Sequence, residues 1–181
     1  MSGSIDMKQY DFTLKFALAQ PDADPDSCVD ALMREDCDDA LIGIGKPGRI
    51  ALNFIREAHS AEEAVMSALA AVKRAIPGSR FIEATPDFVG ITDIANLLGF
   101  SRQNMRKTLA KSGPDFPPPV HDGHRPIWHL EPVLSWFAKK QSRAIDPALL
   151  DISRVNMYCN YAKERGLLDR DVPEDFKRAV A

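Results

Sequence analysis

The sequence predicts an α+β protein in which a βαββαβ domain comes first, a helix-turn-helix with a hairpin second, and a helical segment last. Alternating and helically spaced apolar residues succeed one another through the first half of the 181 residues. A glycine separates two short amphipathic helices in the middle, and the tail carries a broad apolar stripe at helical spacing. We therefore divide the chain into residues 1–86, 87–143 and 144–181.

Four strands are predicted in the first segment. Residues 10–18 (YDFTLKFAL) alternate strictly between apolar and polar side chains, which is the period of a half-buried strand. Residues 40–45 (ALIGIG) and 49–55 (RIALNFI) predict two further strands, joined by a tight hairpin at 46–48 (KPG). Residues 80–84 (RFIEA) predict the fourth strand.

Two helices are predicted between these strands. Asp24 is a suitable N-cap with Pro25 at the first helical position, and Ser60 forms a capping box with Glu63. The Pro-Gly step at 77–78 ends the second helix. The apolar residues at helical spacing are Val29, Leu32 and Met33 in the first helix, and Val65, Leu69, Val72 and Ile76 in the second.

The order βαββαβ resembles the ferredoxin-like fold, with both helices on one side of a four-stranded antiparallel sheet. Sheets of this kind serve as pairing surfaces or small-ligand sensors, and we expect homodimerisation ahead of sensing. Gly43, Gly45 and Gly48 match the dinucleotide-binding pattern GxGxxG. That pattern requires a helix after its last glycine, whereas here a strand follows, so a hairpin is the better interpretation.

Charge is distributed unevenly along this chain of net charge −3. Residues 1–89 contain nine Lys/Arg and fifteen Asp/Glu, whereas residues 90–143 contain eight Lys/Arg and four Asp/Glu. A basic middle segment in an acidic chain is typical of a module that binds a polyanion.

The remaining composition indicates a cytoplasmic protein without a membrane segment. The three cysteines, Cys28, Cys37 and Cys159, form no CxxC pair and indicate reduced thiols. No long apolar run exists, and the first residues lack the pattern of a signal peptide. No catalytic constellation is present, and His121 and His124 are spaced HxxH without a third ligand. We therefore expect no enzyme activity, no cofactor and no metal.

Residues 88–113 predict two short helices separated by a turn. Thr92 is a candidate N-cap for the first helix, and Gly99 supplies the left-handed residue that ends it. Ser101 then caps the second helix, in which Met105 and Leu109 point inward. The outer face consequently presents amides and cations, the groups that read adenine and guanine edges in the major groove. The candidate contacts on this helix are Ser101, Arg102, Gln103, Asn104, Arg106, Lys107 and Lys111.

A hairpin is predicted directly after this second helix. A strand at Val120, a turn at Asp122-Gly123 and a return strand through 127–128 give it the position of a wing. His124 and Arg125 lie at its tip and are further candidate DNA contacts.

Residues 88–140 resemble the winged helix-turn-helix of MerR-type regulators and phage excisionase (AlpA-like) proteins. The matching stretches are ITDIANLLGFSRQNMRK, FPPPV and PIWHLEPVLSWF. The resemblance implies that the second helix enters the major groove and that the wing touches the backbone or minor groove. The wing departs from the family pattern because it has one arginine where several cations are usual.

The tail predicts a helix that begins at Asp146-Pro147. Its apolar stripe has two alternative interpretations, which are docking on its own chain and contact with a second copy. Residues 172–180 (VPEDFKRAV) predict a final short helix. The apolar residues are Leu149, Ile152, Val155, Tyr158 and Ala162, widened by Leu150, Met157 and Tyr161.

These observations together predict a bacterial or phage homodimeric transcription regulator that reads double-stranded DNA with residues 101–112. An excisionase-like protein that bends DNA is a variant of this hypothesis. Two alternatives from other classes remain, an antitoxin or adaptor that binds a protein partner through the acidic first half, and a ligand-gated sensor.

Overall fold

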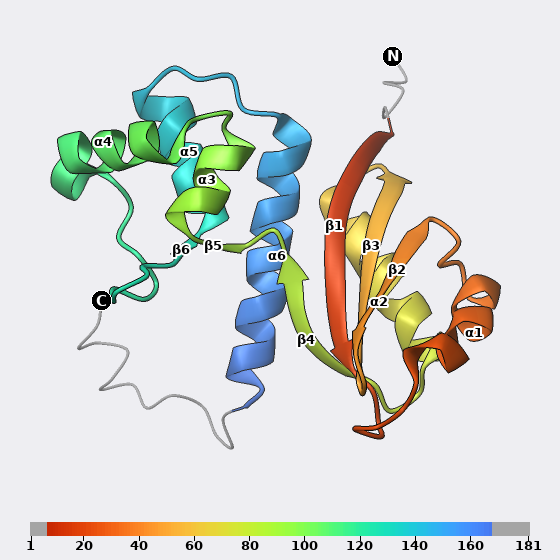
Figure 1. Ribbon diagram of the computed structural model, residues 1–181. Coiled ribbons are helices and arrows are strands. Elements are labelled where there is room, and N and C mark those ends of the chain that lie inside the picture. The colour runs from red at the N-terminus through yellow and green to blue at the C-terminus, as the bar shows by residue number, and fades with distance from the viewer. Residues whose placement is uncertain (1–6, 168–181) are drawn as a thin grey trace, which may run out of the picture.

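The computed structural model of the protein (Figure 1) describes residues 7–167. The described part is α+β, as predicted, with a four-stranded sheet on one side and a group of shorter helices on the other. The long helix α6 (Pro147–Arg165) runs between these two parts. No helix within residues 7–167 combines the length and the apolar character needed to cross a membrane.

The sheet contains β1 (Lys8–Ala17), β2 (Ala40–Lys46), β3 (Arg49–Ala58) and β4 (Arg80–Thr85). Their order is β2-β3-β1-β4, and every neighbouring pair is antiparallel. The hairpin predicted at residues 46–48 joins β2 to β3, so the last glycine of the GxGxxG pattern opens a strand and not a helix.

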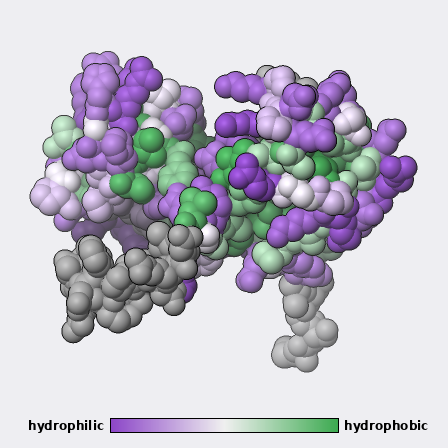
Figure 2. Space-filling model, turned by 90° about the horizontal axis from the view of Figure 1, so that it is seen from below, coloured by the Kyte–Doolittle hydropathy of each residue, from purple (hydrophilic) through white to green (hydrophobic). Residues whose placement is uncertain are grey.

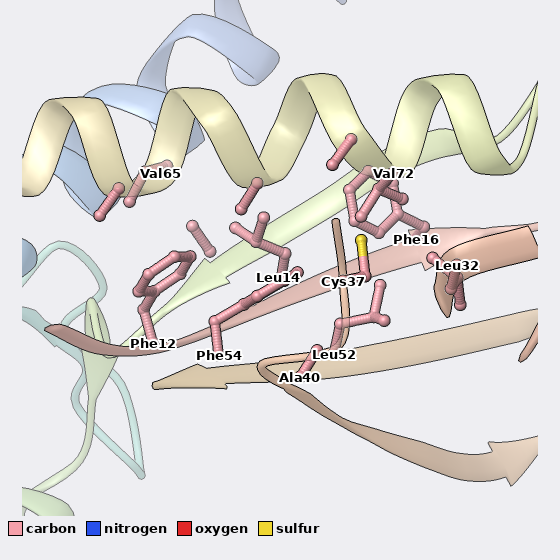
Figure 3. Packing of buried hydrophobic residues seen from close by; sticks show 14 of the residues in the cluster. Phe12, Leu14, Phe16, Leu32, Cys37, Ala40, Leu52, Phe54, Val65 and Val72 are labelled. Carbon is pink, nitrogen blue, oxygen red and sulfur yellow. The ribbon is translucent and has the colours of Figure 1, made fainter. Parts of the chain in front are cut away.

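One face of the sheet forms the larger core. The even-numbered residues of β1 from Tyr10 to Phe16 are at most 1% exposed, and Figure 3 shows Phe12, Leu14 and Phe16 pointing toward α2 (Ala61–Ala75). Phe12 stacks on Phe54 of β3 with ring centroids 5.3 Å apart. Helix α1 (Val29–Arg34) adds Leu32 to the same core. The alternation of β1 therefore places its apolar residues on the covered face.

Side chains cap both N-terminal helices at the predicted residues. Asp24 accepts from the amide of Asp26 before the short 3₁₀ turn Pro25–Cys28. Ser60 accepts from the amide of Glu63 at the start of α2. The predicted reciprocal bond of a capping box is wrong, because the Glu63 carboxylate accepts from the amide of His59 instead.

A buried thiol lies after α1, at Cys37 in the larger core. Burial raises its pKa from 9.0 to about 11, although the charge of Arg56 lowers it. Arg56 itself is held by a bidentate contact with Asp39, with Nε–Oδ2 at 2.6 Å and Nη2–Oδ1 at 2.8 Å. Cys37 is therefore a core residue and an unreactive thiol near neutral pH.

A second, smaller core is formed by residues 89–137. It is assembled from β5 (Phe88–Val89), α3 (Ile91–Leu97), α4 (Arg102–Ser112), β6 (Trp128–His129) and α5 (Leu130–Lys140). Phe116 lies at its centre with ring centroids 5.0 Å from Trp136 and 6.2 Å from Trp128. The prediction of Thr92 as N-cap is wrong, because α3 begins at Ile91 and the Asp93 carboxylate accepts from the amide of Gly90 at 2.8 Å.

Helix α6 docks on its own chain. Ile152 belongs to the larger core, Leu150 packs on the smaller one, and Leu149 contacts both. The predicted apolar stripe is partly wrong, because Tyr158 and Tyr161 are 59% and 65% exposed. The buried positions include Ser153, Asn156 and Asn160. The predicted helix at 172–180 lies outside the described residues.

A buried polar network joins α6 to both parts of the molecule. The amide of Asn160 pairs with the edge strand, accepting from the N–H of Ala84 and donating to its C=O, both at 2.8 Å. The same amide donates to the fully buried carboxylate of Asp87 at 2.7 Å. The other oxygen of Asp87 contacts Nδ1 of His129 at 2.7 Å. Asn160 thus pairs with the outer edge of β4 at Ala84 and, through Asp87, holds the segment that leads to the second core.

Candidate nucleic-acid interface

Helix α4 is positioned by its cap and by one buried residue. Gly99, with φ of +65°, ends α3 and reverses the chain. Ser101 Oγ then accepts from the amide of Asn104 at 3.1 Å, as its N-cap position predicts. Met105 is fully buried in the smaller core, and Leu109 is half-buried against it. The inward face of α4 is therefore fixed and its opposite face is free to meet a ligand.

The predicted contacts on this helix lie on the opposite face and in the first turn, where Ser101 and Arg102 stand. Each of them is exposed, and none of the four cations forms an ion pair with a carboxylate within residues 7–167. Unpaired cations on a rigid helix attract phosphate without first having to release an intramolecular partner. The exposed residues are Ser101, Arg102, Gln103, Asn104, Arg106, Lys107 and Lys111.

A groove of about 490 Å³ separates α4 from the end of α5. Lys107 and Lys111 line it from α4, and Lys140 and Gln141 line it from the other side. Lys140 Nζ also lies 3.6 Å from Asp115. Sequence reasoning did not select Lys140 or Gln141, because helical spacing gives no information on which distant helix end packs beside α4. The Lys-Lys pair at 139–140 was the only signal for them.

One cation of the basic segment has a structural role. Arg143 donates to the C=O of Leu98 at the end of α3, and its guanidinium lies 4.5 Å from the ring centroid of Phe100. This contact satisfies a carbonyl that the end of α3 leaves without a helical partner. Arg143 therefore belongs to the scaffold that orients α3 and α4, and not to the exposed cationic face.

The predicted hairpin is shorter than expected. A single antiparallel bridge pairs His121 with Ile127, and the amide of Ile127 donates to the carbonyl of His121 at 3.0 Å. The return segment then leaves the hairpin, because Trp128 pairs with Val89 in a separate two-stranded sheet. His124 and Arg125 are both exposed at the tip, as predicted.

In the view of Figure 2, hydrophilic residues dominate the margins of both parts, and hydrophobic residues gather nearer the centre.

The comparisons with known proteins identify no relative of this chain. No protein-family model matches it, and a search of curated proteins and of solved structures found no match for it. Within residues 7–167, no group of three or more His, Cys, Asp and Glu side chains is placed to hold a metal ion.

The N-cap gives a first test of how α4 is held. Ser101→Ala is expected to destabilise the protein by about 1 kcal/mol, because the amide of Asn104 loses its acceptor at the helix start. Chemical denaturation monitored by circular dichroism measures this loss. Ser101→Asp, which keeps a capping oxygen, should retain the stability of the wild type. Equal losses of stability for both variants would show that the capping oxygen at residue 101 contributes nothing to stability.

Proposed function

We propose that the protein is a sequence-specific, double-stranded DNA-binding transcription regulator. Its N-terminal part would be a ferredoxin-like domain, which the strand order β2-β3-β1-β4 and the antiparallel pairing support. Residues 87–143 would be a winged helix-turn-helix of the MerR or excisionase type. The observation that carries the proposal is the exposed, unpaired row of cations and amides on α4, opposite the buried Met105.

In this proposal α4 lies in the major groove. Gln103 and Asn104 carry amides that match the edge of adenine, and Arg106 and Lys107 match the acceptors of guanine. Each good bidentate contact contributes roughly 1–3 kcal/mol of discrimination between bases. Arg102 at the helix start would meet phosphate, where free N–H groups also point.

Phosphates on either side of α4 would complete the contact. The groove between α4 and α5 holds Lys107, Lys111 and Lys140, with the hydroxyls of Thr108 and Ser112 beside them. The ammonium groups of Lys111 and Lys140 suit a backbone phosphate, whereas both hydroxyls donate to carbonyls of α4. His124 and Arg125 at the hairpin tip would contact the backbone or minor groove. The short hairpin and its single arginine assign most of the affinity to α4 and the groove.

The Arg106 side chain separates base reading from phosphate binding. Arg106→Ala is expected to weaken binding to the preferred site by about 1–3 kcal/mol and to weaken binding to random duplex much less, because a guanine contact exists only at the right base. Fluorescence anisotropy titrations with both duplexes measure the two losses. Lys73→Ala, an exposed cation on the far helix α2, serves as the matched control and should change neither. Equal losses on both duplexes would make Arg106 a phosphate contact.

One observation favours a ligand-gated version of this function. A cleft of about 460 Å³ lies between α3 and the sheet, at the middle of β1 and the end of β4. Its walls include Thr13 from β1, Phe88 from β5 and Leu97 from α3, so a small molecule there would touch both parts of the molecule. Thermal-shift screening with a metabolite panel tests this version. A melting temperature that no compound changes would count against it.

A further inference from the structure

The uncovered face of the sheet has opposite charge at its two ends. Residues directly opposite each other on neighbouring strands share a face, so the register places Gln9 beside Glu57 and Asp11 beside Ile55 at one end. At the other end Ala17 lies between Arg49 on β3 and Arg80 on β4, and Arg49 is paired with Lys46 on β2. One end is therefore acidic and the other is basic.

These charges are available for contact. Asp11, Glu57, Lys46, Arg49 and Arg80 are all exposed. Neither the three basic residues nor Glu57 forms an ion pair within residues 7–167, and Asp11 only accepts a hydrogen bond from Asn53 at 2.8 Å. Between the two ends, Lys15 is paired with Glu83 of its own chain at 2.8 Å. A surface with charges of opposite sign at its two ends is complementary to one that carries the reverse order of charges.

The same face also has a projection and a hollow. Ile55 is 50% exposed at the acidic end, and Leu41 is 75% exposed beside the middle of the sheet. A hollow of about 390 Å³ lies toward the basic end, where Gly43 and Ala51 leave the surface low. The exposed apolar residues thus lie where a packed partner would bury them, and a small-residue depression lies on the other half of the same face.

We infer that this face is the interface of a homodimer, formed by a two-fold axis that lies between the two sheets and runs across the strands. Such an axis reverses the strand direction and keeps each strand opposite its own copy. Glu57 then faces Arg49 of the second copy, and Ile55 faces the depression at Ala51. Asp11 faces Lys15, whose ammonium group also contacts Glu83 of its own chain. A two-fold axis along the strands would instead place the acidic ends of the two copies against each other, and likewise the two basic ends.

The arrangement also has a consequence for DNA. Both copies of β4 lie on the same side of this dimer, and α6 packs on β4 and connects it to α3–α5. The two copies of α4 are consequently presented on one side, related by the two-fold axis, as a palindromic operator requires. The inference rests on the homodimer contained in the proposed function, and it adds the surface that forms it.

Two single charge reversals test the interface. Arg49→Glu places a carboxylate opposite Glu57 of the second copy, and Glu57→Lys places an ammonium group opposite Arg49. Each variant alone should therefore dimerise at least about tenfold more weakly than the wild type. An equimolar mixture of the two should form a heterodimer, because residues 49 and 57 that face each other across the interface again carry opposite charges. Sedimentation velocity at low salt, with a mass tag on one variant, measures each species. Lys73→Glu on α2 is the control and should dimerise as the wild type does.

The outcomes separate this interface from the DNA-binding function. Weakened single variants and a restored mixture support the interface. A monomeric wild type, or single variants that dimerise normally and mix without preference, would overturn it. Anisotropy titration of the same variants against duplex DNA is a separate measurement of α4. The protein can therefore bind DNA even if this face does not form the dimer, and it can dimerise through this face even if α4 does not bind DNA. Circular dichroism melting confirms that each variant is folded.

Discussion

Asn160→Leu is expected to destabilise the protein by about 3 kcal/mol or more. The substitution keeps the volume of the side chain but removes every hydrogen bond that it makes. The N–H and C=O of Ala84 and one oxygen of Asp87 lose their partner in a place where Asn160 is 1% exposed. Each buried group left unpaired costs roughly 1–3 kcal/mol. In a chain of this length the melting temperature should fall by about 6–12 °C.

Differential scanning calorimetry measures this loss. Asn96→Leu is the matched control, because Asn96 is an exposed asparagine on α3 whose side chain makes no hydrogen bond within the described part of the chain. Its effect should stay within about 0.5 kcal/mol. A melting temperature that falls equally for both variants would contradict the role of Asn160 in holding α6 to the sheet edge and to Asp87.

Gly48→Ala is expected to have an effect of similar size for a different reason. Gly48 has φ of +71° in the turn between β2 and β3, a conformation that disfavours a side chain by roughly 1–2 kcal/mol. An added Cβ would also lie 2.7 Å from the carbonyl carbon of Pro21 and closer still to its oxygen. The turn cannot easily move away, because Gly48 bonds to Ala23 and to Leu18 through its two backbone groups. Overpacking adds about 1–3 kcal/mol.

Gly99→Ala separates the two parts of that cost. Gly99 has a similar φ of +65°, but an added Cβ there meets no atom within 4 Å. Gly99→Ala should therefore destabilise the protein only by the cost of the left-handed backbone conformation, about 1–2 kcal/mol. Urea denaturation of both variants gives the difference. Equal losses would show that the contact with Pro21 relaxes freely and that the turn is not held against residues 18–23.

The features that were predicted correctly depend on neighbouring residues in the chain. The alternation of β1, the caps at Asp24 and Ser101 and the left-handed Gly99 all follow from local geometry, which the sequence displays directly. The exposure of the polar face of α4 follows in the same way, because burying Met105 fixes the direction of the opposite side.

The features that were missed depend on partners far away in the chain. Asn156 and Asn160 look like solvent-facing residues in the tail helix, but the bonds of Asn160 to Ala84 and Asp87 place it inside and turn Tyr158 outward. Thr92 has a side chain that often caps helices, but here the carboxylate of Asp93 accepts the hydrogen bond from the amide of Gly90, the N-cap residue. Lys140 joins the site because α5 ends beside α4, which helical spacing alone does not reveal.

Selection of random duplex DNA by the purified protein, followed by salt titration of the enriched sequences, tests the proposed function most directly. An enriched two-fold motif, with log K falling steeply against log [salt], is expected, because the exposed cations of α4 would release counterions from phosphate. A protein that binds no duplex even at low salt would contradict the proposal and leave the exposed face of α4 as a solvated helix surface.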